Sequence, residues 1–357
     1  MMNLDNLNKI KQLDTGQVAE SISLLPDQTQ QVLEDARLIK LPREYSRITQ
    51  VVINGMGGSN IGARIIKHAF ADQIKAPISI EPGYEVPAHI NANTLYIISS
   101  YSGNTEEPLS AYKKAKKRGA KIAAITSHGK GKLEKLMIKD NIPGYIFKPK
   151  YNPSDQPRLG LGYTFSGTAV LLAKAGLFKI KVQEIENIIA SLKIWNRELS
   201  QQVKTKNNKA KQIAIKLYNK TTTLIAAEFL TGNVKALRNQ MSENSKHLPN
   251  YLTLPELNHF AMEGLAYPVS NKKALVFVFF DSDLYHPRIQ KRGELTKQVV
   301  EKNNIEVIGH KLQGGAKLTQ AFEMLQIGVW ITYYLGMLNG VNPAKIPWVD
   351  WFKKRLK

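Results

Sequence analysis

Short stretches that are apolar throughout alternate with longer stretches in which apolar residues recur at helical spacing. In residues 46–165 this pattern predicts strands at 50–54, 78–80, 94–99, 121–126 and 145–148, and helices at 60–71, 106–118 and 132–139. Continuously apolar strands that alternate with helices indicate a parallel sheet covered on both faces. The first 45 residues are predicted to form helices around Pro26.

The same alternation returns after a Pro- and Gly-rich passage at residues 148–160. It predicts strands at 221–227, 274–280 and 305–309, and helices at 166–176, 183–200, 207–218, 233–247, 286–302 and 316–337. A length of 357 residues, 43% of them hydrophobic, suits two cores. We therefore predict an α/β protein in which each domain is a mainly parallel sheet flanked by helices. The predicted division is an N-terminal helical segment at 1–45, a first domain at 46–165 and a second domain at 166–357.

Two loops rich in serine and glycine each follow a predicted strand and open a predicted helix. The first spans residues 55–62 (Gly-Met-Gly-Gly-Ser-Asn-Ile-Gly), and the second spans residues 99–107 (Ser-Ser-Tyr-Ser-Gly-Asn-Thr-Glu-Glu). Glycines let a backbone approach an anion, and the amides of a helix start point at it. The dinucleotide-binding pattern fails because it needs glycine at Asn60. Each loop alone also fits a tight turn with an N-cap serine.

Hydroxyl groups set these two loops apart from ordinary helix starts. An N-cap needs one hydroxyl, whereas the second loop offers three within six residues, at Ser100, Ser102 and Thr105. Hydroxyls supply neutral hydrogen-bond donors without adding charge. We interpret the two loops together as a pocket for a small phosphorylated molecule.

Ionisable side chains that can carry chemistry gather in the second half of the chain. Residues 238–247 read Arg-Asn-Gln-Met-Ser-Glu-Asn-Ser-Lys-His, and on a helix Asn239, Glu243 and Lys246 or His247 share one face. Further along, Glu256 and His259 lie one turn apart after a proline, a compact arrangement for acid–base work. A solvated helix with a Glu–Lys pair is the alternative interpretation of the first segment.

Composition narrows the class of partner. Fifty Lys and Arg against 29 Asp and Glu give a net charge of +21, and a strongly positive charge is typical of proteins that bind nucleic acid. The lysines are spread along the chain, however, and no compact basic helix carries interleaved aromatic residues, so we expect no nucleic-acid partner. The chain has no cysteine, and its seven histidines form no ligand cluster, so we expect no metal site.

The apolar stretches are short for a membrane protein. The longest of them, Met324 to Leu338, is interrupted by Gln326 and falls short of a bilayer span. The first residues, Met-Met-Asn-Leu-Asp, lack the basic start and apolar stretch of a secretion signal. We expect no membrane partner and a cytoplasmic location.

Six segments of the chain together resemble one family, in the family's own order. They are the two loops, the Pro157-Arg158 turn, the segment from Asn239 to Lys246, the segment from Pro255 to His259, and the C-terminal stretch from Asn342-Pro343 to Lys353. The family is the bifunctional phosphoglucose/phosphomannose isomerases of archaea and some bacteria, which are built from two sugar-isomerase (SIS) domains. The loops are shared by SIS proteins at large, whereas the Glu243 and His259 segments belong to this family. Phe260 departs from it, since an asparagine usually follows the histidine.

The resemblance implies an aldose–ketose isomerase that acts through a cis-enediol. It would interconvert glucose 6-phosphate, and also mannose 6-phosphate, with fructose 6-phosphate, and it would need no cofactor. The implied phosphate-binding residues are Gly58, Ser59, Ser100, Ser102 and Thr105. Glu243 would be the base, Arg158 would stabilise the intermediate, and His259 would assist ring opening with Lys353 as its proton partner. In this family the histidine reaches the pocket of the neighbouring subunit, which implies a homodimer.

Two other functions stay open from the residues alone. A non-catalytic SIS module that senses a sugar phosphate and regulates a partner would need the loops but not Glu243, Arg158 and His259 together. An isomerase for another phosphosugar, such as an amino sugar or a heptulose phosphate, would need all of them. Turnover of fructose 6-phosphate distinguishes the enzyme from the sensor.

Overall fold

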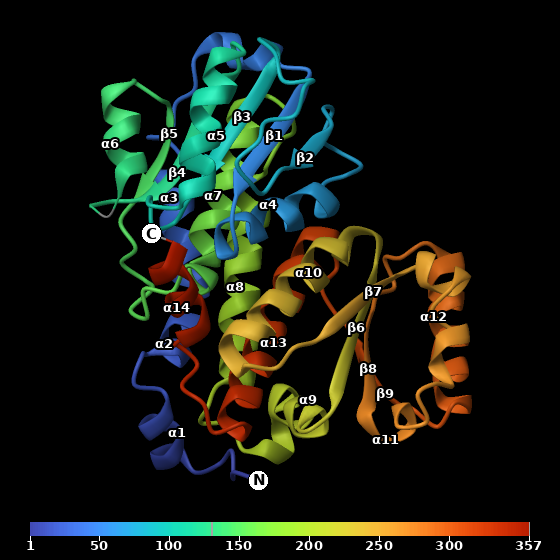
Figure 1. Ribbon diagram of the computed structural model, residues 1–357. Coiled ribbons are helices and arrows are strands. Elements are labelled where there is room, and N and C mark those ends of the chain that lie inside the picture. The colour runs from blue at the N-terminus through green and yellow to red at the C-terminus, as the bar shows by residue number, and fades with distance from the viewer. Residues whose placement is uncertain (130, 357) are drawn as a thin grey trace. The chain divides into compact units, whose positions relative to one another are not determined.

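The computed structural model describes residues 1–129 and 131–356 (Figure 1). These residues divide into two compact units, and each is described by itself. The first unit is residues 24–193, and the second unit is residues 1–23 together with the chain from residue 194 onward. The division falls inside one helix, α8 (Val182–Leu199). The expected boundaries at residues 45 and 165 stay a prediction.

The first unit contains five parallel strands in the order β2-β1-β3-β4-β5. The strands are β1 (Gln50–Gly55), β2 (Ile78–Ile80), β3 (Thr94–Ser99), β4 (Lys121–Ser127) and β5 (Gly144–Phe147). The helices of this unit before α8 are α3 (Leu25–Asp35), η1 (Arg43–Arg47), α4 (Gly58–Ala69), α5 (Glu106–Lys117), α6 (Lys132–Lys139), η2 (Pro157–Leu159) and α7 (Leu161–Lys174). The predicted parallel sheet is therefore confirmed.

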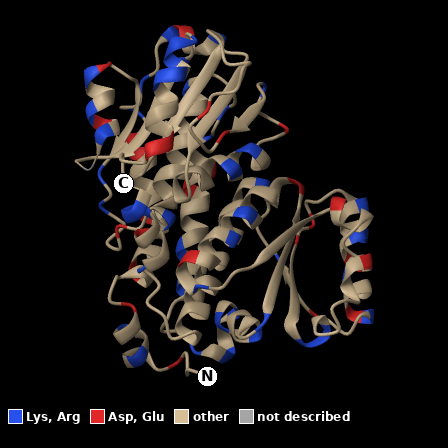
Figure 2. Cartoon of the chain, viewed as in Figure 1, with Lys and Arg blue, Asp and Glu red and all other residues tan. Residues whose placement is uncertain are grey.

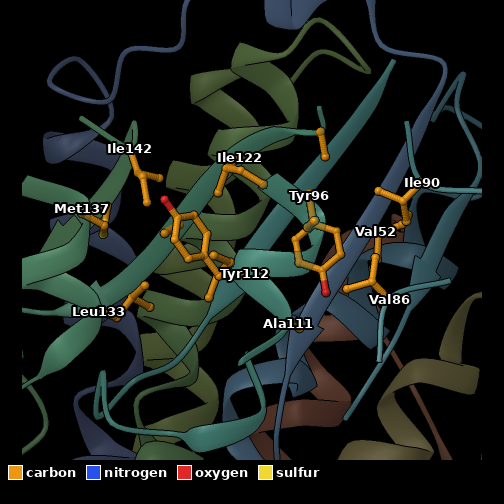
Figure 3. Packing of buried hydrophobic residues seen from close by; sticks show 14 residues of the cluster. Val52, Val86, Ile90, Tyr96, Ala111, Tyr112, Ile122, Leu133, Met137 and Ile142 are labelled. Atoms are coloured by element: carbon orange, nitrogen blue, oxygen red, sulfur yellow. The ribbon is translucent and has the colours of Figure 1, made fainter. Parts of the chain in front are cut away.

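One face of this sheet packs against α5 and α6. Its core contains Tyr96 from β3 and Tyr112 from α5, which lie among Val52, Ile122 and Met137 (Figure 3). The strand side chains in this core pack against other core residues, so they are not available to a ligand. A ligand can bind at the carboxyl ends of the strands and at the loops that follow them. Because the core holds β1 and β3 in place, it also sets the positions at which the two serine-rich loops begin.

The second unit contains a four-stranded sheet, again parallel, in the order β7-β6-β8-β9. The strands are β6 (Thr221–Ala227), β7 (Asn250–Leu254), β8 (Leu275–Asp281) and β9 (Glu306–Lys311). The helices are α1 (Leu7–Leu13), α2 (Val18–Ser23), η3 (Thr205–Asn207), α9 (Lys209–Leu217), η4 (Glu228–Leu230), α10 (Thr231–Gln240), η5 (Met241–Ser245), η6 (Glu256–His259), η7 (Glu263–Leu265), α11 (Asn271–Ala274), α12 (Pro287–Lys302), α13 (Lys317–Leu338) and α14 (Pro347–Leu356).

Helices cover both faces of this second sheet. In Figure 1, α10 and α13 lie on one face and α12 on the other. The connections β6–α10–β7 and β8–α12–β9 run in opposite directions from the sheet centre, and right-handed crossovers then place their helices on opposite faces. Asn233 Nδ2 donates to the carbonyl oxygen of Ala321 at 2.7 Å and ties α10 to α13.

Two predicted features of the second unit are wrong. The strand β7 is missing from the predicted elements, because its five residues lie directly between the end of a helix and Pro255. The helix predicted at 233–247 ends at Ser245 in a π-helical turn, and Lys246 is left-handed at φ 55°. His247 therefore leaves the helix and lies 2.9 Å from the hydroxyl of Thr222, so it does not share a helical face with Glu243.

The first 23 residues are bonded to the rest of the second unit through a buried ammonium group. Lys211 is 0% exposed, and its Nζ donates to Asp5 Oδ1 at 3.1 Å and to the carbonyl oxygens of Gln201 and Val203. The backbone amide and hydroxyl of Thr205 both donate to Asp5 as well. These bonds satisfy a charge that would otherwise be costly to bury.

The positive charges do not gather into one patch. Figure 2 shows Lys and Arg scattered over many helices of both units. Within residues 1–129 and 131–356, no helix is both long and apolar enough to span a bilayer.

Candidate active site

The two serine-rich loops meet at the carboxyl edge of the first sheet. They leave the neighbouring strands β1 and β3, where Gly55 pairs with Ser99, and the chain then turns toward opposite edges of the sheet. Such a switch point is the usual ligand crevice of a parallel sheet. Ser99 Oγ donates to the carbonyl oxygen of Ser59 at 2.6 Å, and the amide of Tyr101 donates to Ser59 Oγ at 2.9 Å. We call this the first crevice.

Neither helix start in the first crevice has a side-chain cap among the described residues. Gly57, with φ 50°, is the N-cap of α4, so Ser59 lies inside the first turn and is not the capping residue. Thr105 is the N-cap of α5, and its hydroxyl does not bond to the helix amides. The first amides of a helix have no partner within the helix, and they attract an anion. The N-cap alternative therefore does not explain these hydroxyls.

Three hydroxyls of the first crevice accept hydrogen bonds from the protein itself. Ser59 accepts from the amide of Tyr101, Ser102 Oγ from the amide of Asn104 at 3.3 Å, and Thr105 Oγ1 from Ser100 Oγ at 2.9 Å. A hydroxyl that accepts such a bond still has its own proton to donate. The crevice can therefore offer several neutral donors to one anion.

Arg158 lies beside the same crevice. A Cβ at Gly58 would stand 2.7 Å from the backbone nitrogen of Arg158, so only glycine lets the first turn of α4 approach η2 this closely. The guanidinium is buried, and its Nη1 donates to Gln156 Oε1 at 2.8 Å. Within the first unit, the structure thus brings together all five predicted phosphate residues and Arg158.

Arg158 is held in place by residues outside the predicted site. Asn152 Nδ2 donates to the hydroxyl of Tyr101 at 2.8 Å and to the carbonyl oxygen of Gln156 at 3.0 Å. These residues belong to the Pro- and Gly-rich passage at 148–160, which resembles a connection between domains. Asn152 and Ser154 are buried in the fold, and no local pattern in the sequence signals that burial.

Glu243 lies in the π-helical turn η5, which continues α10 in the second unit. The turn is anchored to α13 and its C-cap, since Asn244 Nδ2 donates to Thr332 Oγ1 at 3.0 Å and Asn339 Nδ2 donates to the carbonyl oxygen of Ser245 at 2.9 Å. Lys246 Nζ donates to the carbonyl oxygen of Glu243 at 2.8 Å. Single π-helical turns within α-helices are frequent at functional sites. The carboxylate thus projects from a rigid backbone.

His259 and Lys353 lie elsewhere in the second unit. His259 is exposed at the end of η6, which follows β7, and its neighbour Asn258 is bonded to α12. Glu243 belongs to the face of the sheet covered by α10, and the helix that holds Asn258 covers the opposite face (Figure 1). Lys353 is exposed on α14.

The second sheet has a switch point of its own, between β6 and β8, which we call the second crevice. It encloses a cavity of about 150 Å³. Ion pairs line it: Lys297 Nζ lies 2.5 Å from Asp281 Oδ2, and Lys311 Nζ lies 2.8 Å from Asp283 Oδ2. In the loop after β6, the carboxylate of Glu228 accepts a bond from the amide of His286. This arrangement disfavours a phosphate.

Two family models match the chain. A bacterial phospho-glucose isomerase C-terminal SIS domain matches residues 206–356, and an SIS domain matches residues 44–140. A bifunctional phosphoglucose/phosphomannose isomerase of Caldicellulosiruptor bescii is 32% identical over 94% of this chain and 98% of its own. One of the same description from Aquifex aeolicus is 28% identical over 86% of this chain and 90% of its own.

A solved structure shares the fold. A hypothetical protein from Thermus thermophilus superimposes with a TM-score of 0.76 at 14% identity, over 98% of this chain and 94% of that one. This similarity shows that the fold is shared, and the two family models identify the domains as SIS domains.

Proposed function

The chain belongs to the bifunctional phosphoglucose/phosphomannose isomerases, and from that premise we propose which of its residues carry out each step. It is an aldose–ketose isomerase that interconverts glucose 6-phosphate and mannose 6-phosphate with fructose 6-phosphate. One observation carries the site assignment: two helix starts without side-chain caps meet in a crevice rich in hydroxyls.

We assign the sugar phosphate to the first crevice. The assigned residues are Gly58, Ser59, Ser100, Ser102 and Thr105. Neutral donors and helix dipoles hold the phosphate without forming a salt bridge. Binding energy from this non-reacting end then orients carbons 1 and 2 for proton transfer. Because its substrates are phosphorylated hexoses, we expect the enzyme to work in the cytoplasm.

Glu243 is the proposed base. It removes the proton from C2 of the open-chain aldose while the C1 carbonyl oxygen takes up the electron pair. A proton then passes from the C2 hydroxyl to the C1 oxygen, and Glu243 returns its proton to C1 as the C2 carbonyl forms, which gives the ketose. Arg158 stabilises the negative charge that develops on the enediol oxygens. The planar intermediate has no configuration at C2, so glucose and mannose 6-phosphates, which are epimers at that carbon, reach fructose 6-phosphate through the same enediol.

His259 and Lys353 are the proposed pair for ring opening. One proton must leave the anomeric hydroxyl and one must reach the ring oxygen, so two groups that exchange protons are needed. We assign His259 and Lys353 to this exchange near the ring oxygen.

We propose that the active enzyme is a homodimer in which His259 serves the neighbouring subunit. Within one chain, Glu243 and the segment that carries His259 come from opposite faces of the second sheet. A two-fold related copy supplies His259 from outside without any rearrangement of that sheet.

The catalytic assignment is tested with purified protein, fructose 6-phosphate and the variant Glu243→Gln. We expect kcat to fall about 1,000-fold with little change in KM, because the amide keeps the shape but cannot accept a proton. Glucose and mannose 6-phosphates are both measured as products. Glu263→Gln, on an exposed glutamate of the same unit, is the matched control with unchanged kcat. Equal kcat for the parent and Glu243→Gln would overturn the assignment.

The shared site is tested by mixing two inactive variants. A hybrid of Glu243→Gln and His259→Ala subunits contains one complete site if His259 acts across the interface. Equal mixing of the dissociated subunits followed by reassociation then restores about one quarter of parental activity, because half of the dimers are hybrids with one of two sites intact. No recovery in a mixture shown to contain hybrids would exclude a histidine donated by the neighbour.

A further inference from the structure

Two side chains of α12, those of Arg292 and Thr296, form hydrogen bonds with Asn258, the residue that precedes His259. Asn258 Nδ2 donates to Thr296 Oγ1 at 2.8 Å, and Arg292 Nη1 donates to Asn258 Oδ1 at 3.2 Å. Thr296 Oγ1 in turn donates to the carbonyl oxygen of Arg292 at 2.6 Å. Thr296 is 1% exposed, so its hydroxyl has a fixed position. Both ends of the Asn258 amide are therefore held from one helix.

The segment around His259 has one buried side chain of its own and a long contact of 3.7 Å between Asn258 Nδ2 and Met262 Sδ. It is a four-residue 3₁₀ turn, with Leu257 as its buried side chain. The side chains of Glu256, His259 and Phe260 are exposed. A short turn with one apolar anchor can still rotate about that anchor, because contacts at a single point do not fix orientation. The amide of Asn258 supplies the second point.

We propose that Arg292 and Thr296 are positioning residues for ring opening, because they fix Asn258 and so aim the neighbouring His259. The inference depends on the proposed role of His259 in ring opening. Proton transfer needs the imidazole within hydrogen-bond reach of its target, and small misplacements slow it strongly. Arg292 and Thr296 need not touch the substrate.

The test compares two substrates. Fructose 6-phosphate is cyclic in solution and must be opened, whereas 5-deoxyfructose 6-phosphate lacks the C5 hydroxyl and cannot close a furanose ring. Thr296→Val removes the hydroxyl while it keeps the shape. We expect it to lower kcat on fructose 6-phosphate about tenfold, to leave KM within about twofold and to spare kcat on the acyclic analogue. Thr296→Ser restores the hydroxyl and should recover most of the rate.

Arg292→Met is a second variant at a half-buried position, and Arg292→Lys is its conservative partner. Equal loss on both substrates, or no loss on either, would overturn the positioning role. His259→Asn separates this inference from the proposed function. If His259→Asn spares the acyclic analogue while Thr296→Val and Arg292→Met do not, only the positioning inference fails. If His259→Asn slows both substrates equally, the ring-opening role itself fails.

Discussion

In the first unit the crevice between β1 and β3 is lined by hydroxyls, whereas in the second unit the crevice between β6 and β8 is lined by carboxylates and ammonium groups. Both crevices open at a switch point of a parallel sheet. In the second, each ammonium group already has a carboxylate partner, so an incoming phosphate would have to displace an acid. In the first, the donors are neutral and their protons are available.

One matched pair of serines makes the comparison specific. Ser102 Oγ accepts from the amide of Asn104 at 3.3 Å, and Ser282 Oγ accepts from the amide of Leu284 at 2.9 Å. Both bonds span two residues in the loop after the second central strand, β3 or β8. The same kind of local hydrogen bond therefore occurs in both loops, while the surrounding charges differ. Topology supplies the crevice, and the side chains decide whether an anion can use it.

Among the changes that test this difference between the crevices, the largest expected effect comes from giving the first crevice the acidic character of the second. Ser102→Asp keeps an oxygen for the turn and adds a negative charge beside the proposed phosphate. Repulsion at partly screened contact distance is worth about 2 to 3 kcal/mol, so KM for fructose 6-phosphate should rise about 100-fold. Steady-state kinetics at constant ionic strength measure it.

Two controls separate charge from shape. Ser102→Asn is nearly isosteric and neutral, and it should raise KM only about fivefold through the lost hydroxyl. Ser282→Ala removes the matching turn bond from the second crevice and should leave KM unchanged. If Ser102→Asp and Ser102→Asn have the same KM, the phosphate does not bind beside this loop.

The sequence predicts both sheets well because their central strands are apolar throughout. The strand predictions at 78–80, 94–99 and 221–227 match β2, β3 and β6 residue for residue. It fails at β7, an edge strand whose residues Tyr251, Leu252 and Thr253 are only half-buried and lack a clear pattern. The π-helical end of α10 is also invisible, since packing against α13 overrides the helical propensity of residues 241–247.

In the candidate site, too, some residues can be predicted from a local pattern and others cannot. The phosphate loops are local, so Ser59, Ser102 and Thr105 can be read from adjacent residues. Residues that act through the fold cannot be read in this way: Asn152 bonds to Tyr101 from 51 residues away, and Thr296 bonds to Asn258 from 38 residues away. Long-range pairing of this kind leaves no local pattern in one sequence.

The next effect concerns acid stability, which should differ between the two units. Burial first, and then the charge of Lys209, lower the pKa of His310 in β9 from 6.5 to about 4, and burial lowers the pKa of His247. The unfolded chain therefore binds protons that the second unit excludes. Stability is fully present above pH 6.5 and falls as the pH drops toward about 4, by about 3 kcal/mol for His310.

Tryptophan fluorescence can measure this loss in one unit alone. All four tryptophans, Trp195, Trp330, Trp348 and Trp351, belong to the second unit. Urea unfolding followed by their emission should shift to lower urea between pH 7 and pH 4.5. His310→Phe keeps a ring against Phe280 and should reduce the shift. An unchanged shift in His310→Phe would mean that His310 does not cause the acid sensitivity.

The smallest effect lies in the ion pairs of the second crevice. Lys297 and Asp281 are 24% and 31% exposed, and Lys297 also lies over the ring of Phe279 at 5.3 Å. A partly exposed pair of this kind contributes about 1 kcal/mol, so Lys297→Met should lower the free energy of unfolding by that amount without changing KM. A double-mutant cycle with Asp281→Asn isolates the pair, and its coupling should weaken in high salt. The exposed pair of Lys291 and Glu294, 60% and 63% exposed, is the control with no measurable coupling. A rise in KM on breaking the Lys297 pair would instead show that the second crevice takes part in substrate binding. It would contradict the assignment of the sugar phosphate to the first crevice alone.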